Sequence, residues 1–550
     1  MTETKHYFTC LRESMMEGWD KPAISDFEGE VSYTFGELAA QIAKMGILFE
    51  QLGLKAGDKI AICGRNSSNW GLTFLSIMAY RGVAVCILPE FTSESIYELV
   101  AHSEAKVLFV GPWVRGRIDL KKMPTIDTFI AIQDLSIMQS KTSVETAKID
   151  ALFAKRYPNG FGKQDVSFPE NNWEEMAIIN YTSGSTGSPK GVMLTHGNLS
   201  HNVREGQQFY PIDGSKRIVS ILPLAHMFGL MFEFLFELSG GAHIHFITRS
   251  LTPALLMKAF HDVQPHIMAT VPLLLEKIVK KSIFPVIHKP FVKVLWYTPG
   301  INILLRRKVK NNLMKALGGH LDMIAVGGAA LSPDVERCLR QIKLPYTCVY
   351  GMTECGPGIA AVPAKEFKFR SCGKIVEGME LKVDSENPRK VPGEILVRGV
   401  NVMLGYYKNK QATDNVFTED GWLRTGDIGV VDRKGFLYLR GRSKNMILSA
   451  SGQNIYPEEI EDQLNSMDGV AESVVVERDG KLVALVFPEL AQYADWDWER
   501  VKAEFTARMA ENLQRLNKQL PNYSKLSDIE LQEKEFEKTP KKSIKRFLYK

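Results

Sequence analysis

The sequence predicts an α/β fold that is divided into more than one domain. Its 550 residues are too many for a single hydrophobic core. From Tyr33 to Pro89, segments with helical and strand periodicity alternate and are joined by short connections. Strand, helix and strand connected in this way form a parallel sheet that helices cover. Two apolar segments further on, Val107–Val110 and Thr128–Ile132, continue the alternation.

The spacing of apolar residues predicts the first helices and strands of the chain. A helix is predicted after Tyr33 because apolar residues recur at helical spacing, at Leu38, Ile42, Met45, Leu48 and Leu52. Residues 59–63 form a buried strand, residues 70–80 a second helix and residues 83–88 the next strand. A further short strand is predicted at 177–180, and Thr195 or Asn198 can cap a helix after it.

Composition and charge indicate an ordinary globular protein. The net charge of +5 is too small to indicate a dedicated nucleic-acid binder. The seven cysteines are scattered without C-x-x-C pairs, which is typical of reduced thiols in a cytosolic protein. The N-terminus lacks the apolar core of a signal peptide, and Glu233, Glu237 and His243 interrupt the most apolar segment. We therefore expect a cytoplasmic protein without a membrane span, and loose membrane association stays open.

Residues 181–191, YTSGSTGSPKG, are the most informative segment. Glycines and hydroxyl side chains gather there, and Lys190 is the only charge among them. A strand followed by such a loop, ending near a helix start, presents N–H and hydroxyl donors to a polyphosphate, and the lysine adds a point charge. The Walker pattern G-x-x-x-x-G-K-S/T is not present, so this is a different nucleotide loop. A flexible linker would not explain the Pro-Lys-Gly ending.

This loop resembles the phosphate-loop signature of the adenylate-forming superfamily, which includes acyl-CoA synthetases, peptide-synthetase adenylation domains and beetle luciferases. The resemblance implies a fold with a large N-terminal domain of layered, mostly parallel sheets and a small mobile α+β C-terminal domain. It also implies ATP binding by the loop residues Thr182, Ser183, Gly184, Ser185, Thr186, Gly187 and Lys190.

Residues 348–355, CVYGMTEC, form the second strong motif. Tyr350 offers an aromatic face for adenine, Thr353 a hydroxyl for the α-phosphate and Glu354 a carboxylate for Mg²⁺. Gly351 and Met352 belong to the same nucleotide-binding turn. An earlier strand ends in a glycine turn, and the resemblance implies that Gly328, Ala329 and Ala330 lie along the adenine.

The resemblance assigns further residues to the acid and the ribose. Residues 218–229 resemble a motif that ends beside the carboxylate of the acid substrate, which implies this role for His226; a histidine packed at a strand end is the alternative. Residues 420–429 imply that Asp427 accepts the ribose hydroxyls, with Arg442 as a second ribose or phosphate contact. Residues 403–408 resemble a structural motif of the family, which implies that they form strand and turn framework and take no part in catalysis.

The resemblance also divides the chain at Lys444, the position of the hinge about which the C-terminal domain rotates between half-reactions. The implied domains are 1–443 and 444–550. Ser451 and Gly452 resemble the loop that lines the pantetheine channel. Residues 473–476 and 482–487 predict two strands of the C-terminal domain.

The C-terminal tail departs from the family pattern Lys-Thr-Pro-x-x-Lys-Ile-x-Arg. Aligned without a gap, Ser543 stands where the family has the lysine that neutralises charge in the adenylation step. Lys542 is the neighbouring cation that would take this role if the loop shifts by one residue. Removing such a donor typically slows a reaction about 10²–10³-fold. A frayed basic tail is the alternative interpretation.

Taken over residues 33–546, the resemblance implies a two-step ligase that uses ATP, Mg²⁺ and coenzyme A. A carboxylate attacks the α-phosphorus of ATP to give acyl-AMP and pyrophosphate, and a thiol then displaces AMP. Residues 271–278 and 441–459 resemble long-chain fatty acid–CoA ligases, so a long-chain fatty acid is expected.

Several alternatives stay open. The acid can be medium-chain or aromatic, and the acceptor can be an acyl-carrier protein. The chain can also be a catalytically weakened nucleotide- or acyl-binding relative. Residues 255–315 are predicted to be mainly helical, and their basic cluster Arg306–Lys310 is most simply a solvated helix face, with a membrane-surface or partner contact as the alternative. The oligomeric state is not predicted.

Overall fold

The structure is a computed structural model that describes residues 4–144, 146–182, 189–448, 453–478, 480–490, 493, 495–539 and 544–549. Its α-helices are α1 (Tyr7–Glu17), α2 (Phe35–Gln51), α3 (Ser68–Ala79), α4 (Ser93–Ser103), α5 (Pro112–Arg115), α6 (Thr146–Arg156), α7 (His196–Phe209), α8 (Met227–Leu230), α9 (Phe236–Ser239), α10 (Pro253–Val263), α11 (Pro272–Ser282), α12 (Phe284–Ile287), α13 (Pro290–Tyr297), α14 (Ile301–Ala316), α15 (Pro333–Gln341), α16 (Lys410–Val416), α17 (Pro457–Leu464) and α18 (Trp498–Asn517).

The strands are β1 (Pro22–Asp26), β2 (Ser32–Thr34), β3 (Lys59–Cys63), β4 (Val83–Ile87), β5 (Val107–Val110), β6 (Thr128–Ala131), β7 (Ile137–Ser140), β8 (Met176–Thr182), β9 (Lys190–Thr195), β10 (Arg217–Ser220), β11 (His243–Phe246), β12 (Ile267–Thr270), β13 (Met323–Val326), β14 (Tyr346–Cys348), β15 (Tyr350–Gly351), β16 (Gly358–Ala361), β17 (Lys374–Ile375), β18 (Met379–Asp384), β19 (Gly393–Gly399), β20 (Gly405–Tyr406), β21 (Leu423–Val431), β22 (Leu437–Arg442), β23 (Ile447–Leu448), β24 (Asn454–Ile455), β25 (Val470–Arg478), β26 (Lys481–Pro488) and β27 (Asp528–Leu531).

The predicted parallel strands form the centre of an eight-stranded sheet with the order β20-β9-β8-β4-β3-β5-β6-β7. The five strands from β8 to β6 in this order run parallel. The outer strands β9, β20 and β7 are antiparallel to their neighbours. Every residue of β4 is buried, as expected for a sheet with both faces covered. The α/β fold class is therefore confirmed.

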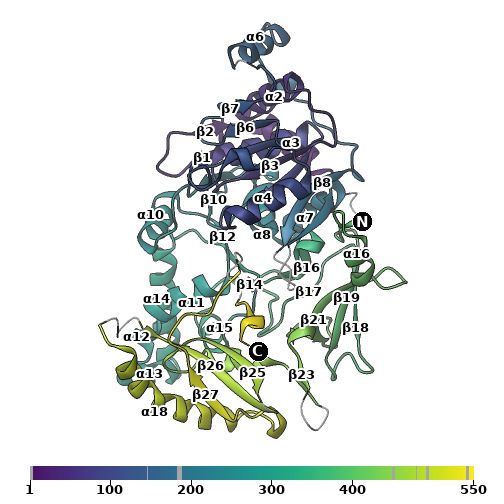
Figure 1. Cartoon of the computed structure of the whole chain (residues 1–550). Helices are drawn as coiled ribbons and strands as arrows, with labels where there is room; N and C mark the ends of the chain where they lie inside the picture. The colour runs from purple at the N-terminus through teal and green to yellow at the C-terminus, as the bar shows by residue number, and fades with distance from the viewer. Residues whose placement is uncertain are drawn as a thin grey trace.

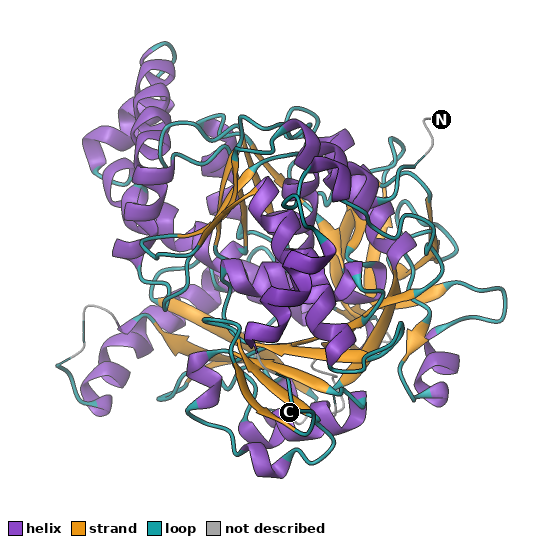
Figure 2. Ribbon diagram, turned by 90° about the horizontal axis from the view of Figure 1, so that it is seen from above, coloured by secondary structure: helices purple, strands orange, loops and turns teal. Residues whose placement is uncertain are grey.

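A second sheet has seven strands in the order β14-β13-β12-β10-β11-β1-β2, and only β2 at its edge is antiparallel. Helix α3 packs between the two sheets, because it contacts β3 and β4 of one and β1 of the other. Its residues from Ser68 to Met78 are all buried, so it has no polar face. Figure 2 shows helices between the groups of strands as well as around them.

The C-terminal third of the chain is mostly antiparallel, although β26 and β27 pair in parallel. Strands β18, β19, β21 and β22 form a four-stranded sheet on the right of Figure 1. Strands β25, β26 and β27 form a separate sheet with α17 and α18 at the lower end of the molecule (Figure 1). Its apolar side chains, among them Ile460, Leu464 and Phe505, form a core cluster of their own. The small α+β C-terminal domain is therefore present, with β27 as a strand that the sequence did not predict.

Candidate functional site

One large cavity of about 2100 Å³ brings the predicted motifs together. Its wall includes the ends of β8 and β9, the turn after β13, the segment from β15 to the 3₁₀ helix η4 (Thr353–Cys355) and the loop before α8. The predicted site residues that line it are Thr182, Lys190, His226, Gly328, Ala329, Tyr350, Gly351, Met352, Thr353, Glu354, Arg442 and Lys444. Of the described candidates, Ala330 and Asp427 do not line it.

The predicted phosphate loop joins the two strands of a hairpin. Thr182 ends β8, Lys190 begins β9, and the two are directly paired. The loop residues Ser183, Gly184, Ser185, Thr186 and Gly187 lie outside the described residues, so their ATP contacts stay predictions. Thr195 caps the following helix α7, as predicted, but the loop does not end directly at that helix. Because Val192 and Leu194 are buried in the sheet, β9 comes between Lys190 and α7, which begins only at His196.

Tyr406 links Lys190 to Glu354. The Lys190 ammonium lies over the Tyr406 ring, 4.8 Å from its centroid. The Tyr406 hydroxyl donates to Glu354 Oε1 at 2.9 Å. Strand β20 places the tyrosine here by pairing with β9. The framework interpretation of residues 403–408 is thus incomplete, because Tyr406 contacts two predicted site residues. Two consecutive tyrosines in this segment were the available signal.

Buried Tyr350 and Asp427 form a cluster with the exposed Arg442, and Tyr350 and Arg442 line the cavity. The Tyr350 hydroxyl donates to Asp427 Oδ2 at 2.7 Å, and Arg442 Nε lies 2.7 Å from Asp427 Oδ1. Burial raises the pKa of the Asp427 carboxyl, and the Arg442 guanidinium opposes the rise. Burial also raises the pKa of Tyr350. Each carboxylate oxygen of Asp427 has one of these partners and can accept a further hydrogen bond. The ribose contact of Asp427 stays a prediction.

Two glycines allow backbone to approach the cavity. Gly328 has φ +89°, which an L side chain rarely adopts. A Cβ on Gly351 would lie 2.1 Å from the Pro357 carbonyl oxygen, so no side chain fits there. Both glycines line the cavity, although the need for glycine at position 351 comes from the neighbouring Pro357 backbone. Thr353, which opens η4, is buried and borders the same space.

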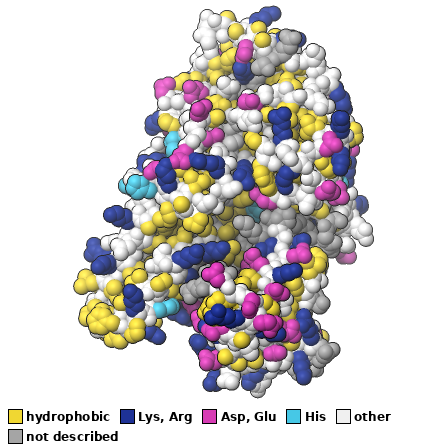
Figure 3. Space-filling view, turned by 60° about the vertical axis from the view of Figure 1, so that its left-hand side comes forward, with side chains coloured by type: hydrophobic (Ala, Val, Ile, Leu, Met, Phe, Trp, Pro, Cys, Tyr) yellow, Lys and Arg dark blue, Asp and Glu magenta, His cyan; other side chains and the backbone are white. Residues whose placement is uncertain are grey.

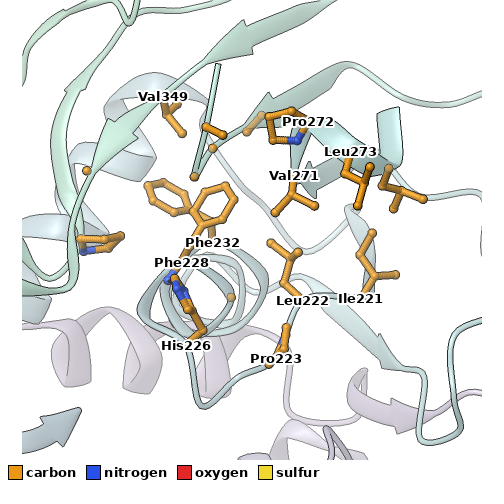
Figure 4. A pocket seen from close by; sticks show the side chains of 18 of the residues that line it. Ile221, Leu222, Pro223, His226, Phe228, Phe232, Val271, Pro272, Leu273 and Val349 are labelled. Atoms are coloured by element: carbon orange, nitrogen blue, oxygen red, sulfur yellow. Dashed lines mark hydrogen bonds between the residues drawn. The ribbon is translucent and has the colours of Figure 1, made fainter. Parts of the chain in front are cut away.

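His226 caps helix α8 at the other side of the cavity. Its Nδ1 accepts from the Phe228 backbone N–H at 3.2 Å. Figure 4 shows Phe228, Phe232, Leu222 and Val271 around one apolar space, with His226 at its edge. Leu222, Phe228 and Ala269 form a buried cluster against which Phe232, Val271 and Val349 pack. A carboxylate beside His226 would therefore have its hydrocarbon part among these side chains.

Glu233 holds the segment before His226 in place. It lies in a π-helical turn, η3 (Met231–Leu235), and is fully buried. Its Oε2 accepts from the Ser220 hydroxyl and from the backbone N–H groups of Ile221 and Leu222, at 2.8–3.0 Å. Burial raises the pKa of Glu233 to about 8, although these donors favour its ionised form. The sequence indicated only that Glu233 interrupts an apolar segment; π-helical bulges of this kind are frequent at functional sites.

The cavity extends from His226 into an apolar arm. Side chains of α10, α11, α12 and α14 line it, including Leu256, Leu274, Ile278, Val286, Val309 and Leu313. The single cavity therefore combines a polar region at the strand ends with a hydrocarbon-lined region among helices. An amphipathic acid would fit this combination.

The C-terminal domain closes another side of the cavity. Lys444, in the 3₁₀ helix η5 (Ser443–Asn445), lines it together with Thr539, Ile544 and Arg546. Arg546 pairs with the buried Glu461, whose pKa burial raises to about 7. The predicted residues Lys542, Ser451 and Gly452, and also Ser543, lie outside the described residues. Their roles stay predictions.

A magnesium ion on Glu354 fits the donor chemistry. Within the described ranges, no group of three His, Cys, Asp or Glu residues is arranged to hold a metal. Mg²⁺ bound with a nucleotide needs only one or two protein carboxylates, since phosphate oxygens and water supply the other ligands. Glu354 is a single carboxylate of this kind at the cavity wall.

Comparison with known sequences identifies the family. The profile of the AMP-binding enzyme family matches residues 11–407, and that of its C-terminal domain matches residues 444–549. The chain belongs to the AMP-binding enzyme family. This is the adenylate-forming superfamily that its motifs resemble.

Curated relatives of this AMP-binding enzyme include ligases for fatty acids. The long-chain-fatty-acid–CoA ligase FadD15 of Mycobacterium bovis is 28% identical over 478 residues, which is 80% of this chain and 75% of the relative. A long-chain-fatty-acid–CoA ligase of Escherichia coli is 29% identical over 500 residues, which is 85% of this chain and 82% of the relative.

Solved structures share the fold of this AMP-binding enzyme. ATP-bound MatB of Rhodopseudomonas palustris matches with a TM-score of 0.76 at 21% identity, covering 100% of this chain and 98% of the other. The anthranilate CoA ligase AuaEII in complex with anthranoyl-AMP matches with a TM-score of 0.77 at 19% identity, covering 100% and 97%. Among the residues that the structure describes, no helix has the length and apolar character needed to cross a membrane.

Proposed function

We propose that this AMP-binding enzyme activates a fatty acid, preferably a long-chain one, as acyl-AMP and transfers the acyl group to coenzyme A. The observation that carries the proposal is the continuity of the cavity, which joins the nucleotide motifs to the apolar arm among α10, α11 and α14. The relatives named above as long-chain-fatty-acid–CoA ligases support the choice of acid.

In the first half-reaction a carboxylate oxygen attacks the α-phosphorus, forming the acyl–phosphate bond while the bond to pyrophosphate breaks. His226 orients the carboxylate at the inner end of the arm, next to the nucleotide motifs. Thr353 donates to the α-phosphate, and Lys190 with Thr182 and the loop after it holds the pyrophosphate. When bound, Mg²⁺ at Glu354 neutralises phosphate charge. The residues act chiefly by positioning and by charge neutralisation.

The tail supplies a further cation in this proposal. Thr539 and Ile544, which precede and follow the tail segment, line the cavity. We assign the neutralising role to Lys542 and expect Lys542→Ala to slow ATP–pyrophosphate exchange about 10²–10³-fold. Lys541→Ala is the matched control. Unchanged exchange in Lys542→Ala, or an equal loss in both variants, would show that the assignment is wrong.

The proposed domains are residues 1–443 and 444–550. For the second half-reaction, the C-terminal domain rotates about Lys444. The rotation brings Ser451 and Gly452 to the pantetheine of coenzyme A. The thiolate then forms the thioester bond, and AMP leaves. Exchanging one set of catalytic groups for another by hinge motion is a known use of mobile domains.

Two measurements on purified enzyme test the proposal. Thioester formation with coenzyme A, measured for acids of graded chain length and for benzoate, is expected to give the highest kcat/KM for a long chain. ATP–pyrophosphate exchange with the same acids isolates the first half-reaction. If ATP–pyrophosphate exchange occurs but the acyl group is transferred to an acyl-carrier protein and not to coenzyme A, the carrier protein is the acceptor. Absence of exchange with every acid would identify a non-catalytic binder and overturn the proposal.

A further inference from the structure

The helical hairpin of α13 and α14 exposes an apolar surface that the proposed function does not use. Phe291 is 74% exposed, Leu304 71% and Ile303 67%, and Val294, Tyr297 and Ile301 are exposed beside them. Figure 3 shows hydrophobic side chains gathered on a projecting lobe at the lower left, where Figure 1 places α12, α13 and α14. Exposed apolar patches of this kind usually mark interaction sites.

The hairpin is a fixed part of the fold rather than a frayed end. Trp296 of α13 is buried, and its indole N–H donates to Gln341 of α15 at 2.8 Å. Arg306 of α14 donates to the Trp296 carbonyl at 3.0 Å, and its guanidinium lies over the indole ring. The contacts of Trp296 and Arg306 therefore fix the hairpin, and the fixed hairpin keeps its outward-facing apolar residues at the surface.

The charged side chains of the hairpin and of the segment that leads into it have one sign. Residues 277–315 contain no Asp or Glu, whereas they contain ten basic residues: Lys277, Lys280, Lys281, Lys289, Lys293, Arg306, Arg307, Lys308, Lys310 and Lys315. Within the described part of the chain none of the ten forms an ion pair. Because the net charge of the whole chain is only +5, the remainder of the chain is net negative.

The α13–α14 hairpin follows directly after helices that line the apolar arm of the cavity. Val286 of α12 and Leu273 of α11 line the apolar arm of the cavity, and both side chains are more than two-fifths exposed, at 43% and 42%. The arm therefore reaches the surface on the helices next to α13. None of Phe291, Ile303 and Leu304 lines the cavity itself.

We infer that the α13–α14 hairpin docks the protein on an anionic lipid surface and presents the mouth of the apolar arm to it. Aromatic and aliphatic side chains insert at the headgroup boundary, and the surrounding cations bind anionic headgroups. A second copy of this chain is a poorer occupant, since two such hairpins would bring twenty cations together without an acidic partner. The docking does not depend on the proposed ligase activity.

Vesicle flotation without substrates tests the inference. The protein is mixed with vesicles of phosphatidylcholine alone, or of phosphatidylcholine with phosphatidylglycerol. Binding to the anionic vesicles only, weakening as salt increases, is the expected result. The variants Phe291→Ser/Ile303→Ser/Leu304→Ser and Lys289→Glu/Lys293→Glu/Lys308→Glu should each weaken partitioning about tenfold or more, since each cation near the surface contributes about fivefold.

Matched controls separate the hairpin from general charge and hydrophobicity. Lys121→Glu/Lys148→Glu/Lys155→Glu removes three exposed lysines that form no ion pair with described residues, and Val391→Ser/Leu404→Ser removes two apolar side chains that are 50% and 51% exposed. Both should bind as the wild type does. Thermal unfolding of each variant excludes misfolding.

Two results would overturn the inference. One is equal binding of the wild type and the hairpin variants to anionic vesicles. The other is an absence of vesicle binding together with a wild-type dimer in light scattering that the serine triple variant converts to a monomer, which would make the hairpin a self-association surface.

Discussion

Tyr406 joins the cation of the phosphate loop to the proposed magnesium ligand. Its hydroxyl donates to Glu354, and its ring lies beneath the Lys190 ammonium. A hydrogen bond to a carboxylate fixes the direction of the oxygen that would bind the metal, and the ring fixes the lysine. Tyr406 thus positions two groups that touch the nucleotide in the proposed mechanism.

Tyr406→Phe should raise the KM for MgATP about tenfold, because a hydrogen bond to a charged group contributes about 1.5–3 kcal/mol. The ring remains, so Lys190 keeps its support; Tyr406→Ala should have a larger effect. Steady-state kinetics over a range of Mg²⁺ concentrations measures this. Tyr407→Phe is the control, since the Tyr407 hydroxyl donates to Glu104 at the surface. An equal KM change in both phenylalanine variants would contradict the role given to Tyr406.

Glu233 makes the stability of the fold depend on pH. Its pKa is about 8 in the folded protein and near the ordinary 4.5 in the unfolded chain. Between these values the folded state holds a proton that the unfolded state has released. The free energy of unfolding therefore falls as pH rises through this window, by at most about 1.4 kcal/mol per pH unit from this group.

Glu233→Gln should reduce this slope between pH 5 and about 8, while the buried Glu237, whose pKa is also raised by burial, leaves a residual slope of the same sign. The amide oxygen still accepts from Ile221 and Leu222, and no charge has to be buried. Chemical denaturation at several pH values measures the slope. Glu98→Gln, at an exposed position of α4, serves as the control. A slope in Glu233→Gln equal to that of the wild type would exclude Glu233 as its source.

At the scale of elements, helix α7 holds together two chain segments that lead into the polar part of the cavity wall. The Asn202 amide donates to the Cys355 carbonyl at 3.3 Å and accepts from the Gly358 N–H at 2.8 Å. The Asn198 amide donates to the carbonyls of Val400 and Val402. One helix therefore holds both the η4 segment with Thr353 and the segment that leads to β20.

Asn202→Ala should lower the free energy of unfolding by about 1–3 kcal/mol, because it leaves buried backbone groups without partners. It should also slow adenylation, since η4 loses its support. Denaturant titration and pyrophosphate exchange measure the two effects. Asn311→Ala, on the exposed side of α14, should change neither. If exchange in Asn202→Ala stays at the wild-type level despite lost stability, α7 has no positioning role.

Elements were predictable where their local pattern was strong. Strand β3 has the predicted ends, and α3 begins two residues before the predicted start because Ser67 caps it. Strands β9 and β27 were missed, since each is defined by its partner rather than by its own pattern: β9 by the hairpin with β8, and β27 by parallel pairing with β26. The contacts of Tyr406 depend on the pairing of β20 with β9 and were missed for the same reason. Those of Glu233 were missed because they depend on packing of η3 against the end of β10.

At the scale of the whole molecule, motifs far apart in the sequence meet in one cavity. Their order and residue types were readable from the sequence through the family resemblance. The apolar arm was not, because helices α10, α11 and α14 contribute scattered side chains whose convergence only the fold determines. The proposed hinge belongs to this scale too, and Lys444, its predicted position, lines the cavity.

Lys444→Pro should separate the two half-reactions. A proline restricts φ at the hinge and so hinders rotation. Thioester formation is expected to fall about tenfold or more, while ATP–pyrophosphate exchange stays near the wild-type rate. Lys444→Ala keeps backbone freedom and should retain both. If both half-reactions fall equally in Lys444→Pro, rotation about this residue is not required for the second step.

The central claim is that nucleotide and acid share one continuous cavity. A crystal structure with a non-hydrolysable analogue of a long-chain acyl-AMP tests it most directly. The adenine is predicted beside Gly328 and Tyr350, and the acyl chain beyond His226 among α10, α11 and α14. An acyl chain that leaves the cavity without entering this arm, or an adenylate bound elsewhere, would contradict the account.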